Sequence, residues 1–144
     1  MRRLLLICWA FTGLFASALA TASPNDEIYA LQQIRGLTQA SLSDFYLLYG
    51  VDQDPKLTLA LEQHILSASG YLLTLQPHSD SGDTGQLAEL KAGWLSYARQ
   101  LKQLNAGMQQ QLRPSPQELL QLINLNQQLL EQTSALITAQ QGTH

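Results

Sequence analysis

The chain contains few charged residues and a single cysteine. Aspartate, glutamate, lysine and arginine make up 13% of its 144 residues, which is roughly half the usual share. The 8 basic residues form no run and are outnumbered by 11 acidic ones, so the charge pattern argues against a nucleic-acid partner. The hydrophobic fraction of 45% is enough for one packed domain and argues against disorder.

The first 22 residues have the pattern of a secretory signal peptide. Arg2 and Arg3 precede an uncharged, mostly apolar stretch over residues 4–19, and small residues surround Ala20 and Ala22. We expect cleavage after Ala20 or Ala22 and export to the periplasm. The alternative is an uncleaved inner-membrane anchor, because this apolar stretch is almost long enough to span a bilayer.

The single cysteine, Cys8, lies inside this apolar stretch. Cleavage would remove it, so we expect a mature chain without a disulfide or a thiolate site. Cleavage would also remove Arg2 and Arg3, which leaves 6 basic residues against 11 acidic ones and a net charge of −5. The expected product is an acidic, cysteine-free, periplasmic protein.

Prolines and glycines divide residues 23–144 into four segments. Ser23-Pro24, Asp54-Pro55 and Ser115-Pro116 each place a capping side chain directly before a proline, which is a typical start of a helix. Gly50, Pro77 and Pro114 provide the corresponding stop signals. The expected helices cover about residues 24–49, 55–76, 84–112 and 116–140.

The spacing of apolar residues supports the same division. In the third segment they recur at alternating steps of three and four, and no segment alternates with a period of two. Helices of similar length joined by short loops pack antiparallel. We therefore predict an all-α fold, an up-down-up-down antiparallel four-helix bundle that follows the signal peptide. The expected core stripe of the third segment is Leu87, Leu90, Trp94, Tyr97, Leu101, Leu104 and Met108.

The first segment departs from this regular pattern, because Arg35, Thr38 and Ser41 interrupt its apolar stripe. One interpretation is that the stripe drifts around the helix and Arg35 reaches solvent. The other is that these polar residues face a binding site or a second subunit, since a charge inside a core is costly. The expected apolar positions of this segment are Ile28, Leu31, Leu42, Phe45, and Leu48 or Tyr49.

Catalytic and cofactor chemistry find little support in the sequence. His64 has no second metal ligand three or four residues away, and His78 and His144 lie in a loop and at the chain end. The haem-attachment, nucleotide-binding and serine-hydrolase motifs are absent. We therefore expect no catalytic residue, no metal site and no cofactor, and interpret the protein as a non-enzyme.

Several short motifs follow one another along the chain. Arg-Gly-Leu-Thr-Gln-Ala occupies 35–40, Tyr-Leu-Leu occupies 46–48, and Gly-Val-Asp at 50–52 precedes a leucine-rich helix. Trp94 and Tyr97 then form a Trp-x-x-Tyr pair, and Asn-Gln-Gln-Leu-Leu follows at 126–130. This order resembles the PilJ-like N-terminal sensor domain of type IV pili methyl-accepting chemotaxis transducers, here standing alone.

The resemblance implies a non-catalytic periplasmic sensor-like module that binds a small ligand or a partner protein. The family's flanking arginines fall at Gln33 and Ala40, so Arg35 alone remains of that motif. Similar first-helix motifs of nitrate-sensing histidine kinases bind a small anion at a dimer interface. The resemblance therefore implies a homodimer through the first helix, a small anion or carboxylate ligand, and an inner-membrane or periplasmic protein partner. Its candidate ligand-binding residues are Arg35, Thr38, Gln39 and Ser41.

A second interpretation is a periplasmic chaperone-like or structural helical interaction protein. Leu37-Thr38-Gln39 resembles the Leu-Thr-x-x-Gln motif of small periplasmic chaperones, but Ser41 stands where that motif has its glutamine. Glutamine-rich helix faces such as 109–111 tolerate contact with another helix. Suppression of aggregation would favour this interpretation, and stabilisation by a small ligand would favour the sensor-like one.

Overall fold

The computed structural model describes residues 24–50, 54–76 and 83–142. This part of the chain is all-helical and contains no strand. The predicted signal peptide over residues 1–22, His78 and His144 lie outside the described residues. The four helices are α2 (Pro24–Gly50), α3 (Pro55–Thr74), α4 (Asp83–Gln109) and α5 (Pro116–Gly142).

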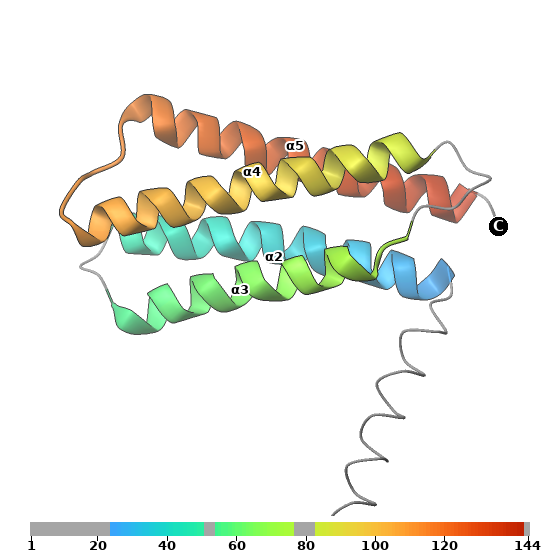
Figure 1. Ribbon diagram of the computed structural model, residues 1–144, viewed down its shortest axis with the longest axis horizontal. Coiled ribbons are helices and arrows are strands. Elements are labelled where there is room, and N and C mark those ends of the chain that lie inside the picture. The colour runs from blue at the N-terminus through green and yellow to red at the C-terminus, as the bar shows by residue number, and fades with distance from the viewer. Residues whose placement is uncertain (1–23, 51–53, 77–82, 143–144) are drawn as a thin grey trace, which may run out of the picture.

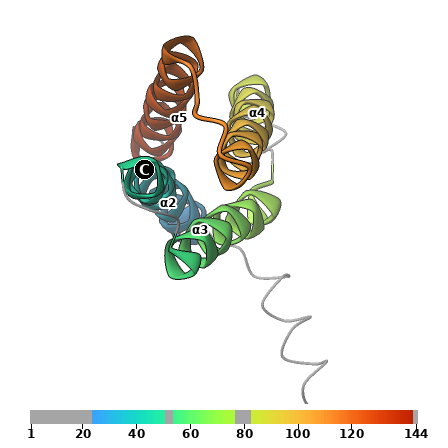
Figure 2. The same ribbon diagram turned by 90° about the vertical axis from the view of Figure 1, so that its left-hand side faces the viewer.

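Consecutive helices run in opposite directions (Figure 1). Seen from one end, the four helices surround a common centre (Figure 2). α2 makes its most extensive contacts with α3 and α5, and α4 makes its most extensive contacts with α5. Of the neighbouring pairs around this ring, α3 and α4 contact each other least. The ring of helices is therefore least tightly closed between α3 and α4.

Capping side chains fix the starts of two helices. Asp54 Oδ1 accepts a hydrogen bond from the backbone N–H of Lys56 at 2.9 Å, at the start of α3. At the start of α5, Ser115 Oγ accepts one from the backbone N–H of Glu118 at 3.1 Å. Both contacts pair backbone donors that have no partner inside the helix. These are the two caps that the sequence predicts at those positions.

α4 ends at Gln109, earlier than the expected boundary near residue 112. The backbone N–H of Leu112 donates to the carbonyl of Gly107 at 2.9 Å, and that of Gln111 donates to Met108 at 3.0 Å. Gln111 has φ 64°. This pattern is a Schellman motif with glutamine in the left-handed position usually taken by glycine. The sequence carries no glycine signal here, so the earlier stop was not predicted.

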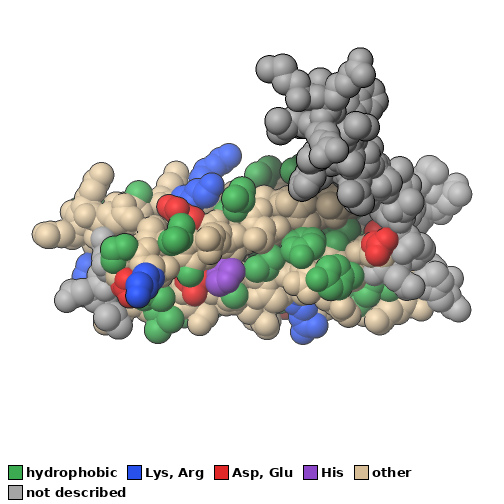
Figure 3. Space-filling model, turned by 90° about the horizontal axis from the view of Figure 1, so that it is seen from below, with side chains coloured by type: hydrophobic (Ala, Val, Ile, Leu, Met, Phe, Trp, Pro, Cys, Tyr) green, Lys and Arg blue, Asp and Glu red, His purple; other side chains and the backbone are tan. Residues whose placement is uncertain are grey.

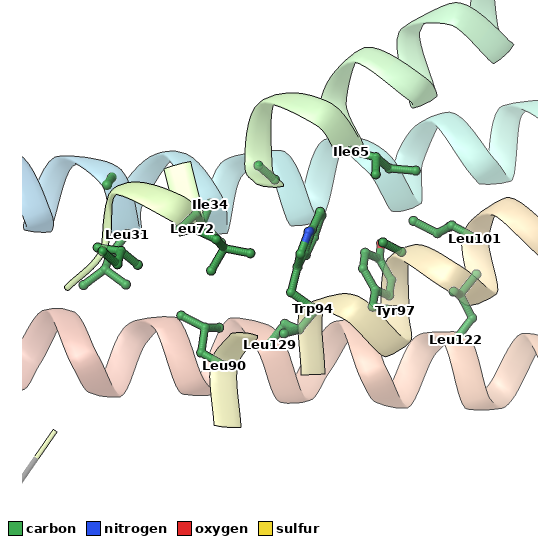
Figure 4. Packing of buried hydrophobic residues seen from close by; sticks show 14 of the residues in the cluster. Leu31, Ile34, Ile65, Leu72, Leu90, Trp94, Tyr97, Leu101, Leu122 and Leu129 are labelled. Carbon is green, nitrogen blue, oxygen red and sulfur yellow. The ribbon is translucent and has the colours of Figure 1, made fainter. Parts of the chain in front are cut away.

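The core follows the stripe predicted for the third segment. Trp94 and Tyr97 are the largest fully buried side chains, with ring centroids 5.5 Å apart. They lie between the helices, surrounded by Leu and Ile side chains (Figure 4). Of the stripe predicted for the third segment, six residues are buried and Met108 is partly buried against the core.

The apolar stripe of α2 runs differently from the expected one. It passes through Ile34, which is 0% exposed, whereas the neighbouring Arg35 is exposed. From Ile34 it continues through Thr38 and Ser41 to Phe45, all of which are fully buried. Steps of four, three and four residues keep these side chains on one face of the helix. The buried stripe thus includes two hydroxyls and leaves Arg35 exposed beside it.

Candidate functional site

A groove of about 530 Å³ lies between α3 and α4. Two hydrogen bonds join these helices at one end of their contact: Trp94 Nε1 donates to Ser69 Oγ at 3.1 Å, and Lys91 Nζ donates to the carbonyl of Leu75 at 3.1 Å. The groove extends from Ser69 toward the start of α3, where neither of these bonds holds the helices together. Its volume falls within the range of roughly 300–1,000 Å³ that small-molecule sites occupy.

Aliphatic side chains form much of the wall of the groove. Leu61 and Ile65 of α3 are buried at its base, Leu66 stands at its exposed edge, and Ala106 faces them from α4. A second hollow of about 460 Å³ shares Glu62 and Gln109 with the groove and continues toward Pro55. The combined surface follows α3 along much of its first half.

Asn105 is the most unusual residue of the groove. Its side chain is only 7% exposed, and its Oδ1 atom is buried without a hydrogen-bond partner in the described residues. An unpaired buried polar atom costs about 1–3 kcal/mol, and most buried polar atoms in proteins do have a partner. Asn105 therefore lines the groove with a side chain whose acceptor oxygen is unpaired and closed to solvent.

Two opposite charges also line the groove. Glu62 lies on α3 and Lys102 on α4, and both side chains are exposed. Within the described ranges neither takes part in an ion pair. The groove thus combines an aliphatic wall, an amide with an unpaired oxygen, one carboxylate and one ammonium group.

A fully buried polar network lies in the core beside this region and orients α4. The Tyr97 hydroxyl contacts Ser41 Oγ at 2.9 Å, and Asn126 Nδ2 donates to Tyr97 Oη at 3.0 Å. Asn126 Nδ2 also donates to the carbonyl of Thr38 at 3.0 Å. One phenol therefore joins α2, α4 and α5. Because the positions of these partners are fixed, the network sets the register of α4.

A second polar contact joins α2 to α3 at the surface. His64 Nδ1 lies 2.5 Å from Asp44 Oδ2, and both side chains are partly buried. His64 has no partner in its own helix, and its partner Asp44 comes from the neighbouring helix α2. This contact holds α3 against α2.

The four residues predicted as one ligand site are divided between two faces of α2. Arg35 and Gln39 are exposed, whereas Thr38 and Ser41 are fully buried. Thr38 Oγ1 donates to the carbonyl of Ile34 at 2.6 Å, and Ser41 contacts Tyr97. The buried pair thus forms part of the core network. Of the four predicted residues, only Arg35 and Gln39 remain accessible.

The groove residues were missed at the level of the sequence. Asn105 follows the core residue Leu101 by one helical turn, so its place in the buried row was readable. The groove beside Asn105 depends on how far apart α3 and α4 pack, which a local sequence pattern does not indicate. No local sequence pattern indicates that Glu62 and Lys102 line the same groove.

No three histidine, cysteine, aspartate or glutamate side chains gather as a metal site among the residues that the structure describes. In the same part of the chain, no helix has the length and apolar character needed to cross a membrane. No family model matches the chain, and neither a curated protein nor a solved structure shows significant similarity to it. A functional proposal therefore stands on the geometry and on the sequence motifs.

Proposed function

We propose that this protein is an exported, non-catalytic four-helix module that binds a small ligand in the α3–α4 groove. The signal-peptide pattern over residues 1–22 supports a periplasmic location after cleavage. The observation that carries the binding role is the buried, unpartnered Oδ1 of Asn105 at the groove wall. A ligand that displaces the atoms covering this oxygen and donates a hydrogen bond to it would pair an acceptor that the folded chain leaves unpaired.

The motif resemblance adds independent support for a sensor-like role. The PilJ-like sensor domain is a ligand-binding or partner-binding module, and the antiparallel order of the four helices agrees with the up-down-up-down bundle proposed for the mature protein. The candidate ligand residues that the resemblance implies lie on the first helix, whereas the groove lies between the second and third helices of the bundle. We therefore place the ligand in the groove and keep Arg35 as a separate surface feature of α2.

A fluorescent label inside the groove tests the binding role directly. Ala106 lines the groove, and Ala88 is exposed on the same helix outside it. In the mature chain, Ala106→Cys and Ala88→Cys each introduce a single thiol for an environment-sensitive dye. We expect fractions of a periplasmic small-molecule extract to change the fluorescence at position 106 and to leave position 88 unchanged.

Adding Asn105→Leu to the labelled Ala106→Cys protein should abolish that response. The proposal fails if no fraction changes the fluorescence at position 106. It also fails if the response survives the loss of the Asn105 amide, because that amide is the group on which the binding role depends.

An interaction or chaperone-like role is the second candidate, and a row of exposed leucines on α3 that adjoins the groove favours it. Leu59, Leu66 and Leu73 are 54%, 74% and 80% exposed and lie seven residues apart on α3. Such spacing keeps them on one side of the helix. On the face of the molecule below α3, apolar side chains alternate with charged ones (Figure 3). This surface can contact another apolar helix.

Light scattering from an aggregating client protein tests this second role. The double variant Leu66→Gln/Leu73→Gln should lose any suppression of aggregation. Leu120→Gln on α5, where the side chain is 58% exposed, should keep it. Equal suppression by all three proteins, or none by the wild type, contradicts the chaperone-like role.

A further inference from the structure

We propose that the ligand of the α3–α4 groove is a short aliphatic peptide with free termini, of about dipeptide size. This inference rests on the proposed binding role and names its ligand class. Four groups in the groove each match one part of such a molecule: Asn105, Glu62, Lys102 and the aliphatic wall.

Asn105 matches the peptide group. A carboxamide side chain carries one acceptor oxygen and a donor NH₂ group, which is the complement of a peptide N–H and C=O. Its Oδ1 is buried and unpaired in the described residues, so a ligand that opens the groove wall beside Asn105 can pair this oxygen only with a donor. A peptide N–H supplies that donor, whereas a hydrocarbon or a simple carboxylate does not.

Glu62 and Lys102 match the two termini. A peptide with free ends carries an ammonium and a carboxylate group, and the groove offers one carboxylate from α3 and one ammonium from α4. Neither group is in an ion pair within the described part of the chain. A ligand of one charge sign would meet attraction at one of these residues and repulsion at the other, so the pair favours a zwitterion.

Length and shape also agree. Two extended residues span about 7 Å, a length that a groove of about 530 Å³ between two helices can contain. Leu61, Ile65 and Ala106 provide an aliphatic wall, and no described aromatic side chain lines the groove. The ligand side chains should therefore be small and aliphatic.

Calorimetric titration with the dipeptide Leu-Ala tests the ligand class. Three analogues each remove one feature: N-acetyl-Leu-Ala lacks the ammonium, Leu-Ala amide lacks the carboxylate, and the peptide-N-methylated form lacks the N–H donor. We expect Leu-Ala to bind and the N-methylated form to bind about tenfold or more weakly, as the loss of a hydrogen bond to a buried acceptor requires. Each charge-deleted analogue should bind about threefold more weakly, as an exposed ion pair implies.

Variants of the groove should show matched effects. Glu62→Gln should reduce the affinity for Leu-Ala and leave that for N-acetyl-Leu-Ala unchanged, because this analogue has no ammonium group to pair. Lys102→Gln should reduce the affinity for Leu-Ala and leave that for Leu-Ala amide unchanged, because the amide has no carboxylate to pair. Glu89→Gln on α4 and Asn124→Leu on α5, both at exposed positions, should bind as the wild type does.

The result separates the ligand class from the proposed function. If Leu-Ala fails to bind while a small-molecule fraction still changes the fluorescence at position 106 in an Asn105-dependent way, the peptide class is wrong and the binding role stands. Equal affinity for Leu-Ala, free leucine and the N-methylated form also overturns the class, because the peptide group then contributes nothing. Loss of both signals overturns both proposals.

Discussion

Asn126 of α5 donates a hydrogen bond from its amide nitrogen to the hydroxyl oxygen of Tyr97 of α4, at 3.0 Å. Both side chains are buried, and the same amide also donates to the carbonyl of Thr38 on α2. The two hydrogen bonds of this one amide thus join three of the four helices inside the core. Asn105, the other buried asparagine, has an unpaired Oδ1 in the described residues. We therefore expect the Asn126 amide to stabilise the fold and the Asn105 amide to destabilise it.

Tyr97→Phe should lower the free energy of unfolding by about 1–3 kcal/mol. The substitution keeps the ring but removes the hydroxyl that contacts Ser41 and Asn126, so one N–H of the buried Asn126 amide loses its acceptor. Urea unfolding followed by circular dichroism measures the change. Tyr46→Phe, at an exposed position, is the control and should have no measurable effect.

The stability of the fold should decrease at alkaline pH. Burial raises the pKa of the Tyr97 hydroxyl above its ordinary value of 10.0, because the phenolate loses its hydration in the core. As the pH rises through about 10, the unfolded chain releases this proton while the folded chain keeps it. The folded state then binds more protons, so stability is fully present below pH 10 and falls above it, until the folded-state pKa is reached. Between about pH 8 and about pH 11, the free energy of unfolding should decline less steeply for Tyr97→Phe than for the wild type.

Gln111→Gly should stabilise the protein by about 0.5 kcal/mol. Gln111 has φ 64°, a conformation that costs a residue with a Cβ about 1–2 kcal/mol, and the greater backbone freedom of glycine in the unfolded chain offsets part of this gain. Gln103→Gly, inside α4 at an exposed position, should instead destabilise the protein by about 1 kcal/mol. Opposite signs in urea unfolding confirm the left-handed cap, and equal signs contradict it.

Arg35→Ala should change the free energy of unfolding by less than about 0.5 kcal/mol, because the side chain is exposed. The anion-linked dimer implied by the family resemblance adds a second expectation. Nitrate should promote self-association of the wild type in sedimentation experiments and should have no effect on Arg35→Ala. Arg99→Ala, another exposed arginine, is the control. Monomers of the wild type in every condition would contradict that dimer.

Most of the fold could be predicted from the sequence, because local signals and periodicity agree. Asp54 and Ser115 cap their helices as expected. The stripe of α4 is buried where the three-four spacing places it. The end of α4 was not predicted, since Gln111 adopts a conformation for which glycine is the usual signal.

The polar residues of α2 show where sequence reasoning fails. Thr38 and Ser41 interrupt an apolar stripe and were interpreted as part of a ligand site. Their partners, Tyr97 and Asn126, come from helices far along the chain, so no local pattern shows that they belong to a core network. The α3–α4 groove was missed for the same reason, because it depends on how α3 and α4 pack.

The central claim is that Asn105 serves binding at the expense of stability, and chemical unfolding of Asn105→Leu tests it most directly. Leucine has a similar volume and removes the unpaired Oδ1, so the free energy of unfolding should rise by about 1 kcal/mol. Asn126→Leu provides the matched contrast and should lower it, because that amide is hydrogen-bonded to Thr38 and Tyr97. A decrease for Asn105→Leu as large as that for Asn126→Leu would show that the Asn105 amide stabilises the fold, and would contradict its role in the groove.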